Sequence, residues 1–506
     1  MRWFAVHLPW LSLEAYAALL PPEARAQPLA LLADHRVQAV NAAAAAAGVQ
    51  PGCKRATALA LAPALQFGQA DAARDAQALQ AVAHAALAFT PAVCVDGATV
   101  LLEVQASLRC FGGAEALLSQ LRRSLAPLGH RVQLAAAPTA LGAALLARWR
   151  DDLAAGPHAT DLAALQQLLD EAPVWLLGPG REHWEALQGM GLRHLSDLRA
   201  LPRAGLARRF GESLLDDLDR ARGTRPDPRD WVVAPERFDA RLELAARADH
   251  ADQVLHAATL LLARLVAWAQ ARCSRVCAFT LRMRHERRHR ADDATPAATA
   301  LRIELAEPAA DVPHLQSLLR ERLARLQLAA PTLELELHCH ECVQRSAPNG
   351  ELFPTRQSEH SGLLRLLEGL RARLGDEGVQ CLQPLPDHRP ERGCHTQPGL
   401  APGGSPVLPG PDPGGWPELP LPRPAWLLPQ PQPLPARQAL PLLDGRPLQL
   451  LAGPERLETG WWDGALAVRD YFIAMADDGS LVWVYRARLP ARDADAPQWF
   501  LQGRFG

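Results

Sequence analysis

Lysine is almost absent from this sequence. Lys54 is the only lysine among 506 residues, and arginine supplies the other permanent side-chain positive charges. Together with the abundant alanine, this composition indicates a bias of the coding sequence, so a missing lysine excludes no function by itself. The formal net charge of −2 excludes the overall positive charge typical of many nucleic-acid-binding proteins. Any DNA-binding patch must therefore be local.

Long apolar runs are absent as well. No uninterrupted apolar stretch reaches about 18 residues, so we expect no membrane span and no membrane partner. The N-terminal residues lack the charged segment and long apolar run of a signal peptide. The nine cysteines are scattered along the chain, which favours reduced thiols. These absences together predict a cytoplasmic protein.

The residues that are present predict several folded domains. A length of 506 residues corresponds to about three or four domains. Residues 4–8 predict a short buried strand, which Pro9 ends because proline has no N–H to donate. His7 therefore stands at the carboxyl end of this strand, where a functional side chain is expected.

Strands and helices alternate up to residue 149. An alanine run ending at Gly48 predicts a helix with a glycine stop, and Asp96-Gly97 is a favoured turn between two strands. The leucine spacing over 114–125 predicts an amphipathic helix, and a further strand and helix follow over 131–149. The order β-β-α-β-α predicts an α+β domain with a mainly antiparallel sheet.

Residues 175–211 have a different pattern. The stretch "LLGPGREHWEAL" places Gly178 and Gly180 at a turn that opens a helix, and "GMGLRHLSDLRALP" adds a second glycine turn. Two short helices around a Gly-x-Gly turn are typical of the helix-hairpin-helix element, whose turn N–H groups hold nucleic-acid phosphates. An ordinary small helical domain is the alternative.

Residues 242–342 predict a second α+β unit of alternating strands, with long helices over 251–271 and 313–326. The end of its first strand is strongly basic, and its positive residues are Arg282, Arg284, His285, Arg287, Arg288, His289 and Arg290. Such a cluster is either a solvated face or a track for phosphates. The residues alone leave both alternatives open.

The segment His338-Cys339-His340-Glu341-Cys342 has residue types that bind metals. It continues the alternating strand "LELEL", so successive side chains point to opposite faces. Only some of the five could converge on one ion. Buried strand cysteines are the preferred interpretation, and we expect no metal site.

Proline and glycine dominate residues 395–440, which predicts an extended linker. Its last part, "RPAWLLPQPQPL", is expected to dock along the next domain. Residues 441–506 predict a small unit of strands joined by tight turns. Its aromatic residues form either a core or an anchor-rich interface, and they include Trp461, Trp462, Trp483 and Trp499.

Taken in order, these motifs resemble a Y-family translesion DNA polymerase. They are the strand ending at His7, "NAAAAAAGVQPG", "CVDGATVLLEV", "LAAAPTALGAALLARW" and "LLGPG…GMGLRHLSDLRALP", and the resemblance covers residues 1–345. With "DHRPE", "GPERLETGWW" and "RDYF" further along, the chain resembles more narrowly the catalytically degenerate Y-family proteins of bacterial mutagenesis cassettes.

The resemblance implies a multidomain α+β fold with Y-family polymerase architecture. The implied domains are a palm (1–12 and 68–165), fingers (13–67), a thumb with the helix-hairpin-helix (166–235), a little finger (240–345), a clamp peptide with a Pro/Gly-rich linker (346–438), and a small aromatic-rich and β-rich C-terminal domain (439–506).

The resemblance also implies that the polymerase chemistry is lost. Active relatives hold two divalent ions with a carboxylate at the end of strand one and an Asp-Glu pair in the hairpin. His7 and Pro9 replace acids here, and Gly97 replaces the glutamate beside Asp96, although Asp-Gly is also simply a good turn. Imidazole is a poor ligand for Mg²⁺. We therefore expect no catalytic residue and no cofactor.

The positions implied to contact the nucleotide are altered in the same way. The triphosphate contacts of active relatives correspond to Ala42 and Ala45, the aromatic gate that excludes ribose to Ser12, and a lysine to Ala140 or Ala144. Coding bias exchanges lysine for arginine but not for alanine. Independent losses at two sites support the same interpretation.

A sliding-clamp peptide is a further implication. Y-family chains carry an extended segment after the last folded domain, whose Leu-Phe pair fills an apolar pocket of the clamp. The stretch "PNGELFPTR" offers Leu352 and Phe353 as the pair, with Asn349 in the position of a glutamine. We expect clamp binding, with an ordinary loop as the alternative.

These observations predict a non-catalytic, DNA-binding adaptor of error-prone translesion synthesis in DNA-damage-induced mutagenesis. The implied partners are DNA, the sliding clamp, an error-prone replicative-type DNA polymerase and a RecA-like accessory protein. The alternative is an active Y-family polymerase that requires Mg²⁺ and uses Asp96 with Glu103 or Glu14. A repair enzyme of another class is a third hypothesis, but the sequence offers it no nucleophile, base or metal cluster.

Overall fold

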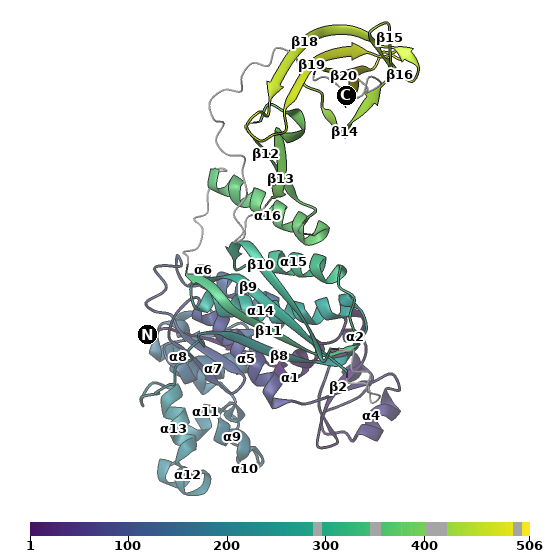
Figure 1. Cartoon of the computed structure of the whole chain (residues 1–506). Coiled ribbons are helices and arrows are strands. Elements are labelled where there is room, and N and C mark those ends of the chain that lie inside the picture. Colours follow the sequence, from purple (N-terminus) through teal and green to yellow (C-terminus); the bar gives the residue numbers. More distant parts are fainter. Residues whose placement is uncertain are drawn as a thin grey trace. The chain divides into compact units, whose positions relative to one another are not determined.

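The computed structural model describes residues 1–286, 296–344, 356–375, 377–385, 387–399, 422–488 and 498–505. The chain divides into two compact units, Met1–Arg373 and Leu374–Gly506, whose elements are labelled in Figure 1. Each unit has hydrophobic clusters of its own.

The first sheet of the N-terminal unit has the order β5-β6-β1-β7 and is antiparallel throughout. Its strands are β1 (Trp3–His7), β5 (Val93–Asp96), β6 (Thr99–Glu103) and β7 (Gln133–Ala137). The prediction of a mainly antiparallel α+β domain is therefore confirmed. Leu8 still donates its N–H to Ala98 O at 2.9 Å, and Pro9 then ends the pairing.

Helices cover both faces of this sheet, which is why β1 is apolar at every position before His7. Phe4 and Val6 face a core shared with α5 (Ala72–Leu87) and α6 (Ala114–Leu125). Trp3 and Ala5 face a second core shared with α7 (Ala140–Trp149). The alternation follows from the two-residue period of a strand.

A smaller sheet of order β3-β2-β4 follows β1 in the chain. Its elements are α1 (Leu11–Ala17), α2 (Pro22–Arg25), β2 (Leu29–Ala33), β3 (Arg36–Val40), α3 (Ala42–Ala46), α4 (Arg55–Leu61) and β4 (Gln66–Gln69). The Asn41 side chain caps α3 by accepting the Ala44 N–H at 2.9 Å. The predicted alanine helix is confirmed, and Gly48 follows it with a positive φ.

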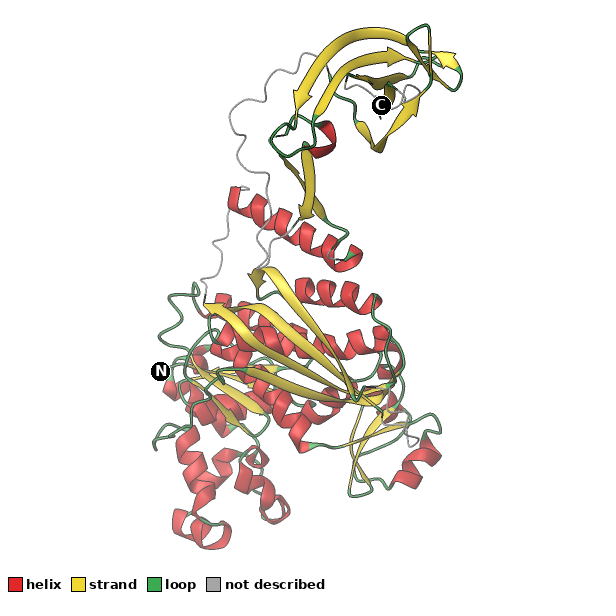
Figure 2. Cartoon of the chain, viewed as in Figure 1, coloured by secondary structure: helices red, strands yellow, loops and turns green. Residues whose placement is uncertain are grey.

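A cluster of short helices continues the core of α7. It comprises η2 (Pro157–Ala159), α8 (Leu162–Asp170), η3 (Val174–Leu176), α9 (Gly178–Glu182), α10 (Trp184–Gly189), α11 (Leu195–Arg199), α12 (Arg203–Phe210) and α13 (Glu212–Ala221). Figure 2 shows this region as helices joined by loops.

The second large sheet has the order β10-β9-β11-β8 and is antiparallel. Its strands are β8 (Phe238–Ala248), β9 (Ser274–His285), β10 (Ala298–Ala309) and β11 (Thr332–Gln344), and one face packs against α14 (Ala251–Ala271) and α15 (Val312–Ala324). Among the described residues, α14 is the one helix long and apolar enough to cross a membrane, but 72% of its apolar window is buried. It serves as a core helix, and its Ala263 and Ala267 also join the core of α5 and α6.

The C-terminal unit is built of strands (Figure 2). It begins with a hairpin of β12 (Gln380–Pro384) and β13 (Cys394–Pro398), which flank the 3₁₀ turn η4 (Pro390–Arg392). A small sheet contains the short strands β15 (Ala436–Arg437), β16 (Leu440–Leu443) and β17 (Arg446–Pro447). The largest sheet has five strands in the order β14 (Trp426–Leu434), β21 (Trp499–Arg504), β20 (Leu481–Ala487), β19 (Ala467–Met475) and β18 (Gln449–Thr459).

The extended linker predicted over 395–440 is wrong for its described residues, because parts of β13, β14 and β15 lie there. The implied segment 346–438 also contains helix α16 (Arg356–Leu374), and Glu368 anchors this helix by accepting from His314 at 3.0 Å. The proline-rich end forms β14, because an edge strand tolerates prolines that an inner strand would not. The expected docking of "RPAWLLPQPQPL" along the next domain is confirmed by the pairing of β14 with β21.

Candidate functional site

His7 ends β1 beside the hairpin of β5 and β6. It is directly opposite Thr99 in the sheet register, and its Nδ1 lies 3.0 Å from the Thr99 hydroxyl oxygen. Burial, reinforced by the positive charges of Arg148 and Arg181, lowers the pKa of His7 to about 4. The imidazole is therefore neutral at physiological pH.

The hairpin carboxylate, Asp96, is held by two arginines. Arg148 Nη2, from α7, lies 3.2 Å from Asp96 Oδ2 and donates to the Asp96 main-chain oxygen at 3.0 Å. Arg229 Nη1 lies 3.4 Å from the same Oδ2, and its Nη2 lies 2.6 Å from Asp227 Oδ2. No local sequence pattern connects either arginine to the hairpin, so neither was predicted from the sequence.

The predicted turn at Asp96-Gly97 is confirmed. Gly97 has φ +58°, a left-handed conformation that favours glycine. A Cβ added to it would stand 4.0 Å from Arg148 Nη2. The glycine therefore serves the turn and brings the backbone close to the guanidinium.

The other carboxylates considered as ligands do not converge on Asp96. Glu103 pairs with Trp3 at the opposite end of β6 from Thr99, about 13 Å away along the strand. Glu14, on α1, accepts the main-chain N–H of Arg131 at 2.9 Å. Within the described ranges, the one group of three possible metal ligands lies elsewhere, on the second large sheet.

The positions assigned to the nucleotide carry little that could hold a phosphate. Ala42 and Ala45 are exposed methyl groups on α3, and Ala140 is buried at the start of α7. Ser12 donates to Asp75 on α5. This hydroxyl is therefore bound within the protein.

The two glycines of the predicted helix-hairpin-helix differ in their surroundings. Both lie in α9, and the exposed Gly178 has open space where a Cβ would point. Gly180 is buried, and a Cβ there would overlap the carbonyl oxygen of Val174. Gly180 is thus required for close packing, and Gly178 is the one at the surface.

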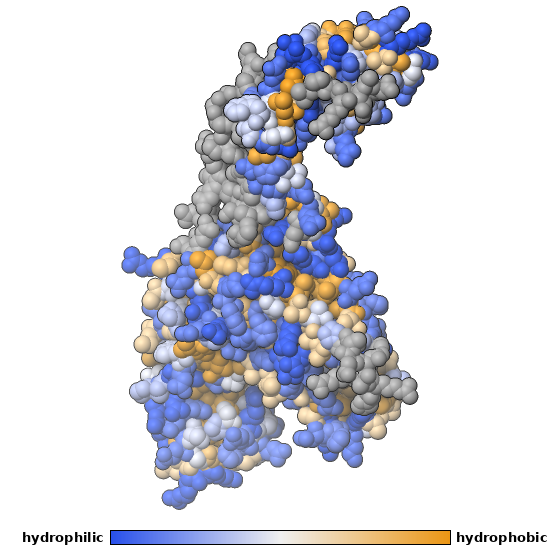
Figure 3. Space-filling model, viewed as in Figure 1, coloured by the Kyte–Doolittle hydropathy of each residue, from blue (hydrophilic) through white to orange (hydrophobic). Residues whose placement is uncertain are grey.

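The outer face of the second large sheet carries Arg282 and Arg284 on β9. Both are exposed and share Glu336 of β11, with Arg282 Nη1 at 3.5 Å and Arg284 Nε at 2.6 Å from its carboxylate. The face is therefore of mixed charge, and Figure 3 shows hydrophilic residues interspersed with apolar ones over this unit. Arg287, Arg288 and Arg290 lie outside the described residues, as do Asn349, Leu352 and Phe353 of the predicted clamp peptide.

The tail motif "DHRPE" is tied to the five-stranded sheet of the C-terminal unit. The Arg389 side chain is 3% exposed, and its Nη2 lies 2.6 Å from Oδ2 of both Asp387 and Asp463. Glu391 accepts from Arg469 and from Gln502, each at 2.8 Å. Arg389 and Glu391 of this motif therefore have a structural role in the C-terminal unit.

The aromatic residues of this unit divide between core and surface. Trp483 and Trp499 are buried, whereas Trp461 and Trp462 are 77% and 54% exposed. The exposed pair stands edge to face, with ring centroids 5.5 Å apart. The core interpretation is therefore confirmed for Trp483 and Trp499, and the interface interpretation stays a prediction.

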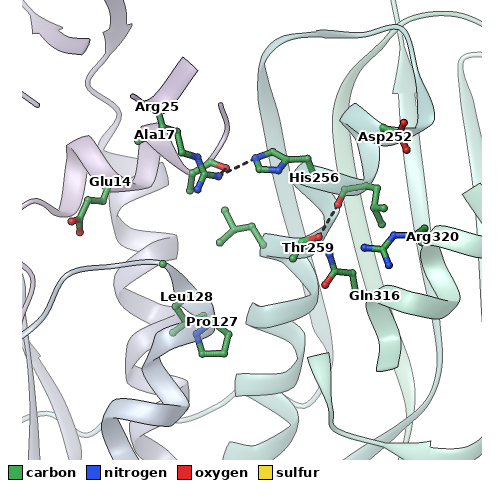
Figure 4. Close-up of a pocket in the computed structure, with 14 residues that line it drawn as sticks. Glu14, Ala17, Arg25, Pro127, Leu128, Asp252, His256, Thr259, Gln316 and Arg320 are labelled. Carbon is green, nitrogen blue, oxygen red and sulfur yellow. Dashed lines mark hydrogen bonds between the residues drawn. The ribbon is translucent and has the colours of Figure 1, made fainter. Parts of the chain in front are cut away.

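A cavity of about 510 Å³ lies within the N-terminal unit. Figure 4 shows Glu14 and Arg25 on one side and residues of α14 and α15, including His256 and Arg320, on the other. Arg25 Nη2 lies 2.9 Å from His256 Nε2, and that Nε2 lies 2.8 Å from Leu20 O. Polar groups of Leu20 and Arg25 therefore contact His256 of α14 beside this cavity.

Comparison with known proteins gives three results. The impB/mucB/samB family matches residues 13–148. Protein ImuB of Caulobacter vibrioides, in strains NA1000 / CB15N and ATCC 19089 / CIP 103742 / CB 15, is 30% identical over 479 residues, which cover 91% of this chain and 100% of the relative. Two solved structures are similar in fold. The Dbh ternary complex with partially disordered substrates is 15% identical, with a TM-score of 0.38, and the match covers 68% of this chain and 99% of that chain. DinB from Sulfolobus solfataricus is 15% identical, with a TM-score of 0.37, and the match covers 67% of this chain and 98% of that chain.

Proposed function

Because this chain belongs to the ImuB family of Y-family polymerase-related proteins, we propose that it is a non-catalytic DNA-binding adaptor of error-prone translesion synthesis. The observation that carries the proposal is the pairing of Asp96 with Arg148 and Arg229. In an active polymerase, this hairpin must present carboxylates to two divalent ions. Here two fixed cations surround the carboxylate that remains.

Mg²⁺ does not fit this arrangement. The ion requires near-octahedral oxygen ligands and usually one or two carboxylates with substrate phosphates. The end of β1 offers an imidazole instead, whose low pKa keeps it neutral, and nitrogen ligands suit softer metals. An Mg²⁺ ion at Asp96 would also have to displace two guanidinium groups.

DNA is the first partner of the proposed adaptor. The exposed Gly178 at the start of α9 and the outer sheet face with Arg282 and Arg284 support this assignment. The remaining basic residues of the stretch, Arg287, Arg288 and Arg290, belong to the same proposal. Phosphate contacts of this kind give binding that depends on salt and is indifferent to sequence.

The protein partners follow from the family. We propose that Asn349, Leu352 and Phe353 bind the sliding clamp, and that the chain recruits an error-prone replicative-type polymerase and a RecA-like accessory protein. The exposed pair Trp461 and Trp462 supports a contact made by the C-terminal unit, because tryptophan is enriched among the residues that dominate interface energies. The role implied is DNA-damage-induced mutagenesis.

The experiment that tests the proposal is primer extension by the purified full chain. Undamaged and lesion-containing templates are used with Mg²⁺, and an active Y-family polymerase serves as positive control. We expect no extension by the chain alone. The competing function, an active polymerase, gains support if the chain extends primers in a Mg²⁺-dependent way and loses this activity in Asp96→Ala.

A further inference from the structure

Strand β11 contains a β-bulge between His338 and Cys342. His338 pairs with Thr280 of β9, and the next pairs along are Glu341 with Ala278 and Cys342 with Val276, so the register shifts twice within this stretch. A bulge inserts an extra residue, bends the strand and re-aims its side chains. The bulge therefore changes which side chains of this segment meet.

The bulge places the two cysteines together on the inner side of the sheet. Cys339 is buried and its Sγ lies 3.4 Å from Sγ of Cys342. Residues three apart in a regular strand point to opposite faces, so this contact depends on the bulge. The preferred sequence interpretation, buried strand cysteines, is confirmed for Cys339.

The two histidines meet an acid on the outer side. His338 is directly opposite Asp239 of β8 in the register. His338 Nδ1 lies 2.6 Å from Asp239 Oδ1, and His340 Nε2 lies 3.2 Å from the same oxygen. One ligand atom from each of the three residues lies within 4.8 Å of the other two.

We propose that Asp239, His338 and His340 form a binding site for a divalent transition metal, with Zn²⁺ as the ion that fits best. Zinc accepts imidazole nitrogen and carboxylate oxygen at about 2.0–2.2 Å and is commonly held by three protein ligands with a fourth position left open. Tetrahedral ligands at that range stand about 3.4 Å apart, which small side-chain movements reach from the observed distances. The side chains are about half exposed, so water can occupy the fourth position.

One feature outside the three ligands supports the site. His338 Nε2, the nitrogen turned away from Asp239, lies 3.7 Å from the Glu336 carboxylate, and metal-binding histidines commonly orient their second nitrogen toward such a group.

Hard cations are a poorer fit than zinc. Mg²⁺ and Ca²⁺ prefer several oxygen ligands, whereas two of the three ligand atoms here are nitrogens. The sulfur atoms of Cys339 and Cys342 belong to the opposite side of the strand and are not part of the proposed site. This inference departs from the sequence expectation of no metal, because Asp239 is about a hundred residues away from the histidines.

The test is zinc binding by the full chain after treatment with a chelator. A competing chromophoric chelator measures affinity, and we expect about one tightly bound Zn²⁺ per chain. His338→Ala, His340→Ala and Asp239→Ala should each weaken binding at least tenfold. Glu336→Gln should weaken it by about 10–100-fold. His395→Ala, an exposed histidine of β13, is the matched control and should bind zinc normally.

Cobalt substitution separates this site from the cysteine pair. Co²⁺ bound by nitrogen and oxygen ligands shows visible d–d bands without the near-ultraviolet charge-transfer absorption that thiolates give. Unchanged zinc affinity in the His338→Ala/His340→Ala double variant overturns the proposal. So does a loss of zinc in Cys339→Ser/Cys342→Ser, or the absence of zinc binding by the parent chain. Circular dichroism of each metal-free variant checks that the sheet is folded.

Discussion

Arg148 contacts Asp96 twice, since its Nη2 lies 3.2 Å from the side-chain Oδ2 and donates to the main-chain oxygen at 3.0 Å. The guanidinium therefore fixes both the charge and the backbone of the hairpin turn. Arginine stays protonated under all physiological conditions. A positive charge is thus a permanent part of this site.

This pairing predicts that restoring carboxylates will not restore catalysis. His7→Asp with Gly97→Glu should give little or no primer extension, because Arg148 and Arg229 still occupy the space around Asp96 and the exposed methyl groups of α3 cannot hold the triphosphate. Glutamate at φ +58° also adds strain of about 1–2 kcal/mol. The measurement is Mg²⁺-dependent primer extension by this double variant and by a triple variant that also carries Arg148→Ala. Extension by the double variant at a rate near that of an active polymerase contradicts the interpretation.

The buried histidines predict acid sensitivity of the N-terminal unit. Burial lowers the pKa of both His7 and His84 to about 4, against about 6.5 in the unfolded chain. Between these values the unfolded state binds more protons, so stability is full above pH 6.5 and falls as the pH drops toward 4. The loss between pH 7.5 and 4 should be about 3 kcal/mol for His84, which is 5% exposed, and less for the partly exposed His7.

His84→Leu should therefore flatten the pH dependence. The measurement is the urea unfolding midpoint between pH 7.5 and 4.5 for the variant and the parent chain. His395→Ala is the control, because that exposed side chain gives no reason for a change. Equal slopes for His84→Leu and the parent would show that His84 does not titrate as described.

Glu336 contacts Arg282 and Arg284, so removing the acid and removing the arginines should change DNA affinity in opposite directions. Removing Arg282 or Arg284 should weaken binding and reduce the magnitude of the log–log salt slope by about 0.7–0.9 for each phosphate that the protein no longer neutralises. Glu336→Gln should strengthen binding, because it releases both arginines from their shared carboxylate. Fluorescence anisotropy with a labelled duplex over a range of salt concentrations measures both. If the slope is the same in Arg282→Ala/Arg284→Ala, these arginines form a solvated face only.

The two glycines of α9 form a matched pair for stability. Gly180→Ala should destabilise the helical cluster by about 1–3 kcal/mol, because the added methyl group overlaps the Val174 carbonyl oxygen. Gly178→Ala should leave the fold unchanged, since nothing lies within 4 Å of its added Cβ. Amide hydrogen exchange over α8–α13 measures the difference. Equal protection in the two variants is the result that argues against the packing role.

The proposed clamp peptide gives a prediction that leaves the fold untouched. Leu352→Ala/Phe353→Ala should abolish clamp pull-down, since anchor residues of this kind contribute about 2 kcal/mol or more on truncation, which lowers affinity roughly thirtyfold. DNA binding by the same variant is the control and should be unchanged. Unaltered clamp affinity would move the contact elsewhere, with Gln344 as the next position to change.

Local sequence patterns predicted the elements around the site well. The Asp96-Gly97 hairpin, the alanine helix that stops before Gly48 and the leucine face of α6 depend on neighbouring residues, and the structure confirms them. Turn chemistry and helical spacing are short-range effects. They can therefore be read from one stretch of sequence at a time.

Contacts between distant segments could not be predicted in this way. Arg148 and Arg229 reach Asp96 from 52 and 133 positions away. Glu336, which Arg282 and Arg284 share, gives mixed charge to a face that the sequence predicted to be strongly basic. The bulge in β11 is set by its pairing with β9 and leaves no signature in its own residues. Composition also misled at residues 426–434, where frequent proline suggested a linker and the chain forms an edge strand.

The prolines of β14 have a consequence for how the C-terminal unit meets other proteins. Pro429, Pro431 and Pro433 recur at every second position of an edge strand, and none of them has an N–H group to donate to a neighbouring strand. A foreign strand cannot extend the sheet there, which also guards against edge-to-edge aggregation. Partners at this edge must instead be recognised through side chains.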